Sequence, residues 1–301
     1  MRILMPIDGS SYSKAALGFI AARSTLIQSQ PDVQLLDVQY PVSTRVARAA
    51  GRELVQHHHE LQANKIIKPA VAALKRAGLV AQVKSVVGIP GVEVGRVAAE
   101  DAADLVVMGS HGHTGFKNLL FGSVTQAVLA SCNTPLLVLR TDVTPKTDSL
   151  NVGIALDGSK YGLAAVRFVI KHRTLFGATP VLTLIHVVPD LLNPGPSRFF
   201  GPSLPPAYKT GQAEALQRDE FERVLAPARK LLKATTLQVN EAQLTGNQPG
   251  DVIAAYATKS KFDILVIGSH GEGAFVSAVL GSVATRVAAK SRNALLFIQQ
   301  K

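Results

Sequence analysis

One short sequence pattern occurs twice in this chain, and it constrains the fold more than any other feature. The apolar run 105–108 is followed by Gly109-Ser110-His111-Gly112, nine further residues and Gly122-Ser123. The same order returns as Gly268-Ser269-His270-Gly271, nine residues and Gly281-Ser282. A short apolar run, a glycine turn and a helix that begins at Gly-Ser form a strand–loop–helix unit. The repeat therefore predicts two copies of one α/β domain.

A second repeat precedes the first in each copy. Met5-Pro6-Ile7-Asp8-Gly9-Ser10 returns as Ile154-Ala155-Leu156-Asp157-Gly158-Ser159, so that Asp8 and Asp157 are 149 positions apart, whereas the glycine loops are 159 apart. The second copy thus holds about ten extra residues, and the segment 189–206, with six prolines and two glycines, is their expected place. We predict a domain over 1–140, a linker over 141–149 and a second domain over 150–301.

Strands and helices are expected to alternate along both copies. The predicted strands cover 2–7, 33–40, 79–87, 104–109 and 135–140, then 151–156, 181–188, 237–244, 263–268 and 294–299. The predicted helices of the first copy cover 11–28, 48–77 with a kink or break near Pro69, 91–103 and 122–132, and a helix over 212–234 in the second copy is expected to kink at Pro227. This alternation indicates right-handed crossovers and a parallel sheet with helices on both faces. Ligands of such sheets bind at the carboxyl ends of the strands, where Asp8, Asp157 and both glycine loops fall.

Composition limits the classes of function. The 301 residues suffice for two cores, and no apolar run approaches the roughly 20 residues of a membrane span. The N-terminus lacks the features of a signal peptide, and the single Cys132 forms no internal disulfide, so that we expect a cytoplasmic protein. The net charge of +11 is spread over both copies. It suits phosphate-bearing ligands or a solvated surface, and no nucleic-acid module is present, so dedicated nucleic-acid binding is not expected.

The glycine loops carry the chemistry that the sequence offers. Backbone N–H groups at a helix N-terminus bind phosphate, and Gly109 and Gly112 allow the chain to approach a ligand closely. Neither the P-loop pattern nor the Gly-x-Gly-x-x-Gly fingerprint occurs. The alternative is that the glycines only make a tight connection between strand and helix. Two copies with identical spacing favour a nucleotide loop in at least one of them.

The spacing Gly-x2-Gly-x9-Gly-Ser, together with the Asp-Gly-Ser turn, resembles the universal stress protein family over nearly the whole chain. The resemblance implies two tandem Rossmann-like domains of the adenine nucleotide alpha hydrolase type, each with a five-stranded parallel sheet, and ATP binding, with Mg²⁺ expected alongside. Pairing of the last strands, 136–139 with 295–298, is implied too, and further dimerisation stays open. The residues that match the family's ATP site in the first copy are Pro6, Asp8, Val38, Met108, Gly109, Gly112, His113, Gly122, Ser123 and Val124. Those of the second copy are Asp157, Val187, Ile267, Gly268, Gly271, Gly281, Ser282 and Val283.

Two departures weaken the second site. Ala155 stands where the first copy has Pro6, and Glu272 stands where the first copy has His113. A carboxylate beside a triphosphate is repulsive unless a cation intervenes. The first loop offers Lys117 as well as His113. We therefore expect the first site to bind more tightly.

Several other residues allow a functional and a structural interpretation. Asp8 and Asp157 can hold a ribose hydroxyl or Mg²⁺, or cap the following helix. His57-His58-His59 point in different directions on a helix and are expected to face solvent rather than a metal, and His111 and His270 are expected to shape their turns. Cys132 is expected to be buried, and Arg229, Lys230 and Lys233 to lie on an exposed helix face.

No nucleophile with an adjacent base is evident from the sequence, so ATP hydrolysis is expected to be slow or absent. The sequence predicts an ATP-binding regulator of stress response with an unknown protein partner. Two alternatives stay open: a slow ATP-cleaving enzyme of the same fold, and an interaction module that binds no nucleotide.

Overall fold

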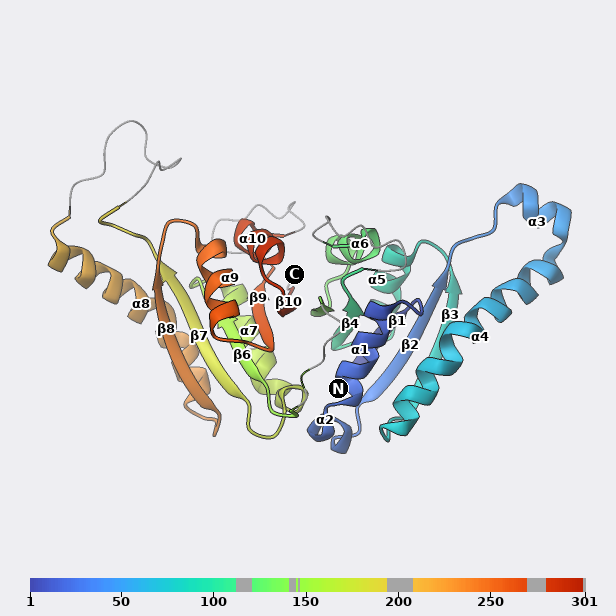
Figure 1. Ribbon diagram of the computed structural model, residues 1–301, viewed down its shortest axis with the longest axis horizontal. Helices are drawn as coiled ribbons and strands as arrows, with labels where there is room; N and C mark the ends of the chain where they lie inside the picture. Colours follow the sequence, from blue (N-terminus) through green and yellow to red (C-terminus); the bar gives the residue numbers. More distant parts are fainter. Residues whose placement is uncertain (112–120, 141–144, 146, 194–207, 270–279, 300–301) are drawn as a thin grey trace.

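The computed structural model describes residues 1–111, 121–140, 145, 147–193, 208–269 and 280–299. The part from β1 to β5 is here called the first domain and the part from β6 to β10 the second domain (Figure 1). The first domain contains β1 (Arg2–Ile7), α1 (Ser11–Ala21), α2 (Ser24–Gln28), β2 (Asp32–Gln39), α3 (Thr44–Ala50), α4 (Arg52–Arg76), β3 (Ala81–Val87), α5 (Pro90–Glu100), β4 (Leu105–Gly109), α6 (Ser123–Ser131) and β5 (Leu136–Leu139). The second contains β6 (Asn151–Ala155), α7 (Lys160–Lys171), η1 (Arg173–Phe176), β7 (Val181–Val188), α8 (Thr210–Leu232), β8 (Gln238–Thr245), α9 (Pro249–Lys259), β9 (Ile264–Gly268), α10 (Ser282–Lys290) and β10 (Ala294–Ile298).

The ten strands form one continuous sheet in the order β3-β2-β1-β4-β5-β10-β9-β6-β7-β8. All pairs within a domain are parallel, whereas β5 and β10 pair antiparallel, with Leu137 opposite Leu296. The predicted α/β class, the five parallel strands of each domain and the pairing through the last strands are confirmed. The boundaries of the linker stay a prediction.

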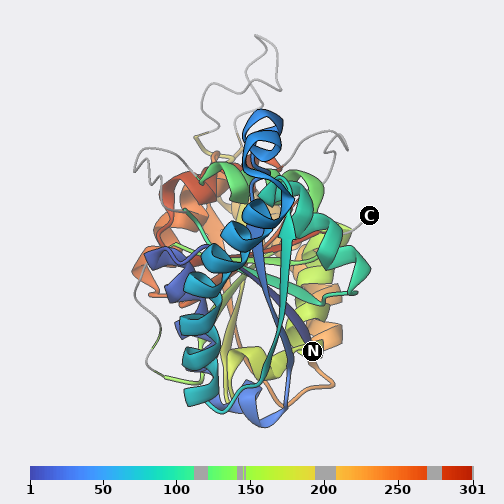
Figure 2. The same cartoon turned by 90° about the vertical axis from the view of Figure 1, so that its right-hand side faces the viewer.

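Two apolar layers cover the sheet. One face packs against α1, α4, α7 and α8, and the other against α5, α6, α9 and α10 (Figures 1 and 2). The central strands are apolar on both faces because both faces are covered, and all five residues of β4 are buried. Among the helices that the structure describes, none combines the length and the apolar character that a membrane crossing requires.

Two expectations about the helices need adjustment, and the kink at Pro227 stays a prediction. The predicted helix 11–28 is two helices, because the chain changes direction at Arg23 between α1 and α2. The break predicted near Pro69 lies instead at Gly51, whose φ of +81° is a conformation that glycine adopts readily. Pro69 lies inside the unbroken α4, and Pro227 lies inside α8. Both prolines remove one backbone donor without ending their helix.

Two similar hydrogen bonds join the domains, and each domain donates one of them. Arg140, which follows β5, donates to the carbonyl oxygen of Ala288 at the end of α10. Gln299, which follows β10, donates to the carbonyl oxygen of Leu129 in α6 at 3.2 Å. Each last strand therefore ends in a side chain that binds the last helix of the other domain.

Candidate functional site

A cavity of about 290 Å³ opens at the carboxyl ends of β1, β2 and β4 in the first domain. It lies on the side of the sheet that carries α5 and α6, beside the N-terminus of α6. Its walls are Pro6, Ile7, Asp8, Ser13, Leu36, Val38, Tyr40, Pro90, Val94, Met108, Gly109, His111, Gly122, Ser123, Val124 and Thr125. This is the edge at which parallel α/β sheets bind their ligands.

The Asp8 turn forms one side of the cavity. The Asp8 carboxylate accepts a hydrogen bond from the backbone N–H of Ser10 at 3.0 Å, and the Ser10 hydroxyl accepts one from the N–H of Ser13 at 3.1 Å. Ser10, and not Asp8, is thus the N-cap of α1. Asp8 holds the turn that precedes the helix and also lines the cavity, so that its structural and ligand-binding roles are compatible.

Gly109 and Gly122, the two described glycines of the first loop, have different structural roles. A Cβ added at Gly109 would lie 2.5 Å from Cβ of Tyr12 and 2.7 Å from its carbonyl carbon. Close packing of α1 on β4 therefore requires Gly109, whether or not a ligand binds. Gly122 is the N-cap of α6, where no side chain caps the helix. The N-terminus of α6 thus presents backbone donors and the Ser123 hydroxyl beside the cavity.

Hydrogen bonds fix the loop on both sides of the cavity entrance. Gly122 N–H donates to the Ser110 carbonyl at 2.8 Å, and the Thr125 hydroxyl lies 3.2 Å from the carbonyl oxygen of Gly109. His111 Nδ1 lies 3.0 Å from the Ser110 hydroxyl, and its ring centroid is 5.4 Å from that of Tyr12. His111 therefore makes the local bond expected of it and lines the cavity as well.

The structure brings together eight of the ten residues predicted for the first site. They are Pro6, Asp8, Val38, Met108, Gly109, Gly122, Ser123 and Val124. Gly112 and His113 lie outside the described residues. Sequence reasoning missed Tyr40, Pro90 and Val94 as wall residues. The proline that starts α5 directly after β3 could have indicated that α5 begins at the same edge of the sheet.

The second domain repeats the local geometry. The Asp157 carboxylate accepts from Ser159 N–H at 3.0 Å, and Gly281, the uncapped N-cap of α10, donates to the Ser269 carbonyl at 2.7 Å. Val187 and Ile267 are buried at the carboxyl ends of β7 and β9, and Val283 packs against the same apolar layer. Gly268 ends β9 and Ser282 begins α10. Gly271 lies outside the described residues, as do His270 and Glu272.

In the part of the chain that is described, the remaining candidates do not line the cavity of the first domain. No group of three His, Cys, Asp or Glu side chains among the described residues could hold a metal ion, and this includes the His57–His59 run. Burial raises the pKa of the Cys132 thiol, which is 4% exposed. Arg229 is not a free surface cation, because its guanidinium bonds Glu222 and Glu241 across α8 and β8.

The repeat seen in the sequence and the fold is also that of a known family. The model of the universal stress protein family matches residues 1–140 and again 150–299. The chain belongs to the universal stress protein family.

Individual relatives agree with two tandem copies. A universal stress protein of Mycolicibacterium smegmatis is 27% identical over 99% of this chain and 97% of its own length. One from Methanocaldococcus jannaschii is 31% identical and spans 46% of this chain and 94% of itself, so that it matches a single domain. A solved universal stress protein of Archaeoglobus fulgidus covers 100% of this chain and 98% of its own with a TM-score of 0.70; at 20% identity it supports the fold alone.

Proposed function

We propose that this universal stress protein binds ATP in the cavity of its first domain and acts as a nucleotide-dependent regulator in stress response. The observation that supports it best is the convergence of eight predicted site residues on one cavity beside the uncapped N-terminus of α6. Strand ends, a glycine turn and open backbone donors are what a nucleotide needs, because they combine an apolar wall with anion-binding N–H groups.

The chemistry of the walls differs from one end of the cavity to the other. Val38, Val94 and Met108 form an apolar surface suited to the adenine ring. Gly122 and Ser123 place backbone donors and a hydroxyl where the phosphates would lie. We propose that the adenosine lies against β2 and β4 and that the phosphates extend toward α6.

A magnesium ion would depend on the nucleotide itself. Asp8 is the acidic residue of the cavity wall, and the described residues contain no cluster of three metal-binding side chains. Mg²⁺ commonly binds one or two carboxylates together with substrate phosphates. These residues fit an ion that arrives with ATP and neutralises its phosphates.

We propose a weaker second site, at Asp157, Gly281 and Ser282. The local hydrogen bonds of the two domains match, whereas Pro6 is replaced by Ala155 and Glu272 adds a carboxylate to the loop. A regulator needs bound nucleotide more than rapid turnover, so that slow or absent hydrolysis is compatible with this function. A cytoplasmic location, a protein partner and a homodimer are further parts of the proposal.

Calorimetric titration of the intact chain with Mg-ATP tests this function, with one blocking variant in each domain. Val38 and Val187 occupy equivalent positions at the ends of β2 and β7. The variant Val38→Trp would fill the first cavity, and we expect it to weaken the stronger binding event by at least about tenfold, or 1.4 kcal/mol. Val187→Trp, the matched control, is expected to leave that event unchanged.

Three results would contradict parts of this proposal. Absence of binding by folded, ligand-free protein would exclude the nucleotide function and leave the interaction module. Loss of the stronger event in Val187→Trp alone would reverse the ranking of the sites. Steady phosphate or pyrophosphate release above a control without protein would favour the ATP-cleaving enzyme.

A further inference from the structure

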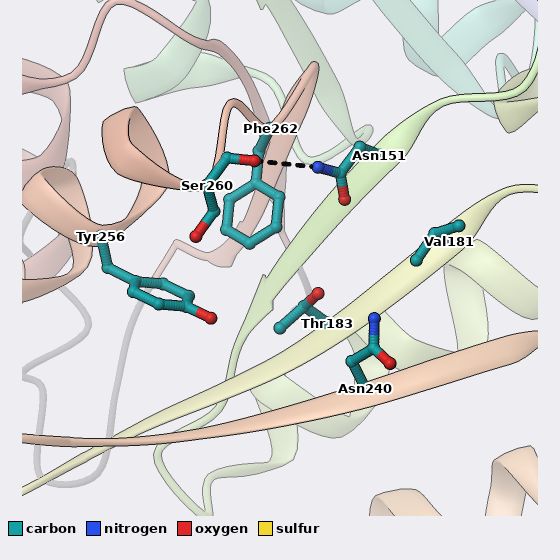
Figure 3. A pocket seen from close by; sticks show the side chains of 7 residues that line it. All are labelled: Asn151, Val181, Thr183, Asn240, Tyr256, Ser260 and Phe262. Atoms are coloured by element: carbon teal, nitrogen blue, oxygen red, sulfur yellow. Dashed lines mark hydrogen bonds between the residues drawn. The ribbon is translucent and has the colours of Figure 1, made fainter.

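A second hollow lies in the second domain, at the amino-terminal ends of the strands. The glycine loops lie at the opposite, carboxyl-terminal ends. This polar groove has a volume of about 490 Å³ and opens at the amino-terminal ends of β6, β7 and β8, below the end of α9 (Figure 3). Its lining is Asn151, Val181, Thr183, Asn240, Tyr256, Ser260 and Phe262. None of these side chains is charged, in a protein whose net charge is +11.

Several hydrogen-bonding groups of the polar groove are unused. The hydroxyl of Thr183 makes no hydrogen bond among the described residues, and it is accessible from the groove rather than buried. The side chains of Asn240, Tyr256 and Ser260 likewise make no hydrogen bond within the described parts of the chain. Asn151 uses one amide hydrogen, which it donates to the Ser260 carbonyl at 3.0 Å (Figure 3). Unpaired polar groups in a hollow are available to a ligand that supplies hydroxyl groups.

The equivalent place in the first domain has different side chains and a smaller hollow. Strand registers make Lys84 and Ala242 equivalent, and both Asp101 and Ser260 are the C-cap of their helix. In the first domain the Lys84 ammonium lies 2.9 Å from the Asp101 carboxylate, and the hollow there measures about 230 Å³. Alanine and serine in the second domain remove this ion pair.

The second domain also adds aromatic rings at this place. Tyr256 and Phe262 occupy the positions of Val97 and Ala103, and their ring centroids are 5.8 Å apart at 63°. A Cβ at Gly153 would lie 2.8 Å from the Phe262 ring, so that this glycine makes room for it. The rings give the polar groove an apolar wall, and Figure 3 shows the Tyr256 hydroxyl directed toward the side of Thr183 and Asn240.

We propose that the polar groove binds a small neutral cyclic polyol of monosaccharide size. The Tyr256 ring contacts the apolar face of such a polyol, while the unused hydroxyl and amide groups bind its hydroxyls. A charged ligand is disfavoured because the groove offers no counter-charge to repay its desolvation. This site is separate from the proposed ATP site, because the two open at opposite ends of the strands.

Saturation-transfer NMR on the full chain tests this site, with myo-inositol and D-glucose as neutral probes. Their charged counterparts are D-gluconate and D-glucosamine. We expect saturable transfer to at least one neutral probe and weaker transfer to the charged ones. The double variant Ala242→Lys/Ser260→Asp transplants the ion pair of the first domain into the groove. It is expected to weaken binding by at least about tenfold.

Two further variants separate binding from folding. Lys84→Ala/Asp101→Ser makes the reverse change in the first domain and is expected to leave probe binding unchanged. Tyr256→Val introduces the side chain that the first domain carries there and is expected to weaken binding even if the double variant fails to fold. The proposal is overturned if neither neutral probe shows saturable transfer, if the charged compounds bind equally well, or if Tyr256→Val binds as the natural chain does.

Discussion

The two domains share one backbone plan, yet they use it with different charges where they meet. Arg23, at the end of α1, and His172, at the end of α7, are equivalent residues 149 positions apart. Asp263, which precedes β9, attracts the charge of Arg23 from a distance, whereas His172 Nε2 lies 4.0 Å from Oδ1 of Asp104, which precedes β4. The first domain thus has a permanent positive charge at this place, and the second has an imidazole, whose charge depends on pH. Of these two positions, only the histidine can gain or lose its charge in the ordinary pH range.

The arginine half is expected to be the stronger. Arg23 is fully buried and donates to the carbonyl oxygens of Asp148 at 2.7 Å and Pro145 at 3.0 Å. Arg23→Ala would leave these acceptors and two nearby carboxylates without their cation, and we expect a loss of about 3–5 kcal/mol in the free energy of unfolding. His172→Ala is expected to cost about 1 kcal/mol. Urea unfolding followed by circular dichroism measures both.

Arg218→Ala provides the control, because Arg218 is exposed on α8. Its effect is expected to stay within about 0.5 kcal/mol. A loss for Arg23→Ala as small as that of the control would show that the hydrogen bonds from Arg23 to Pro145 and Asp148 do not stabilise the fold.

The histidine half is expected to make stability depend on pH. Burial lowers the pKa of His172 below its ordinary value, against the attraction of Asp104, while Lys171 and the N-terminal amine add to the lowering. Because the folded pKa is the lower one, the unfolded chain binds the proton more readily. The contribution of neutral His172 is therefore complete above about pH 6.5 and is lost as the pH falls toward the folded pKa.

Replacing the imidazole should reduce this dependence. We expect the decrease in unfolding free energy between pH 7.5 and 5.5 to be smaller in His172→Gln than in the natural chain. Asp104 stays ionised over this range: burial tends to raise its pKa, but the Arg2 amide and the charges of His172 and Lys171 hold it below its ordinary value. Identical pH profiles of the two proteins would exclude His172 as the source.

Most of the fold followed from the sequence because its signals are local and repeated. Buried strands between turn residues were predicted to within one or two residues, and the Asp8 and Gly122 turns marked the carboxyl edge. The break at Gly51 was missed because glycine and proline both interrupt helices, and only the structure shows that Pro69 fits inside α4.

The walls of the two hollows show where sequence reasoning ends. Tyr40 and Val94 reach the cavity of the first domain only because β2 and α5 lie beside β1 and β4 in space. The polar groove unites Asn151, Thr183 and Asn240 from three strands, with no motif linking them. Such sites depend on which strands are neighbours, and a sequence pattern does not contain that information directly.

The smallest difference in stability between the domains is expected at the two outermost strands of the sheet, β3 and β8. At equivalent places the first domain has Val71 and Val83, whereas the second has the ion pair of Arg229 and Glu241 at 2.7 Å. Val83 is 45% exposed on the edge strand β3, and an exposed apolar edge favours association with other chains. Val71→Arg/Val83→Glu is expected to lower the unfolding free energy by about 0.5–1 kcal/mol, because Val71 packs partly against the core and the new ion pair offsets little of that loss.

The two outermost strands are expected to differ more in their effect on self-association than in their effect on stability. Sedimentation of Val71→Arg/Val83→Glu is expected to show weaker association than the natural chain, and the reverse change, Arg229→Val/Glu241→Val, stronger association. If both variants sediment as the natural chain does, neither edge takes part in self-association. Any dimer would then form through another surface, and the apolar edge of the first domain would have no part in the difference between the two halves.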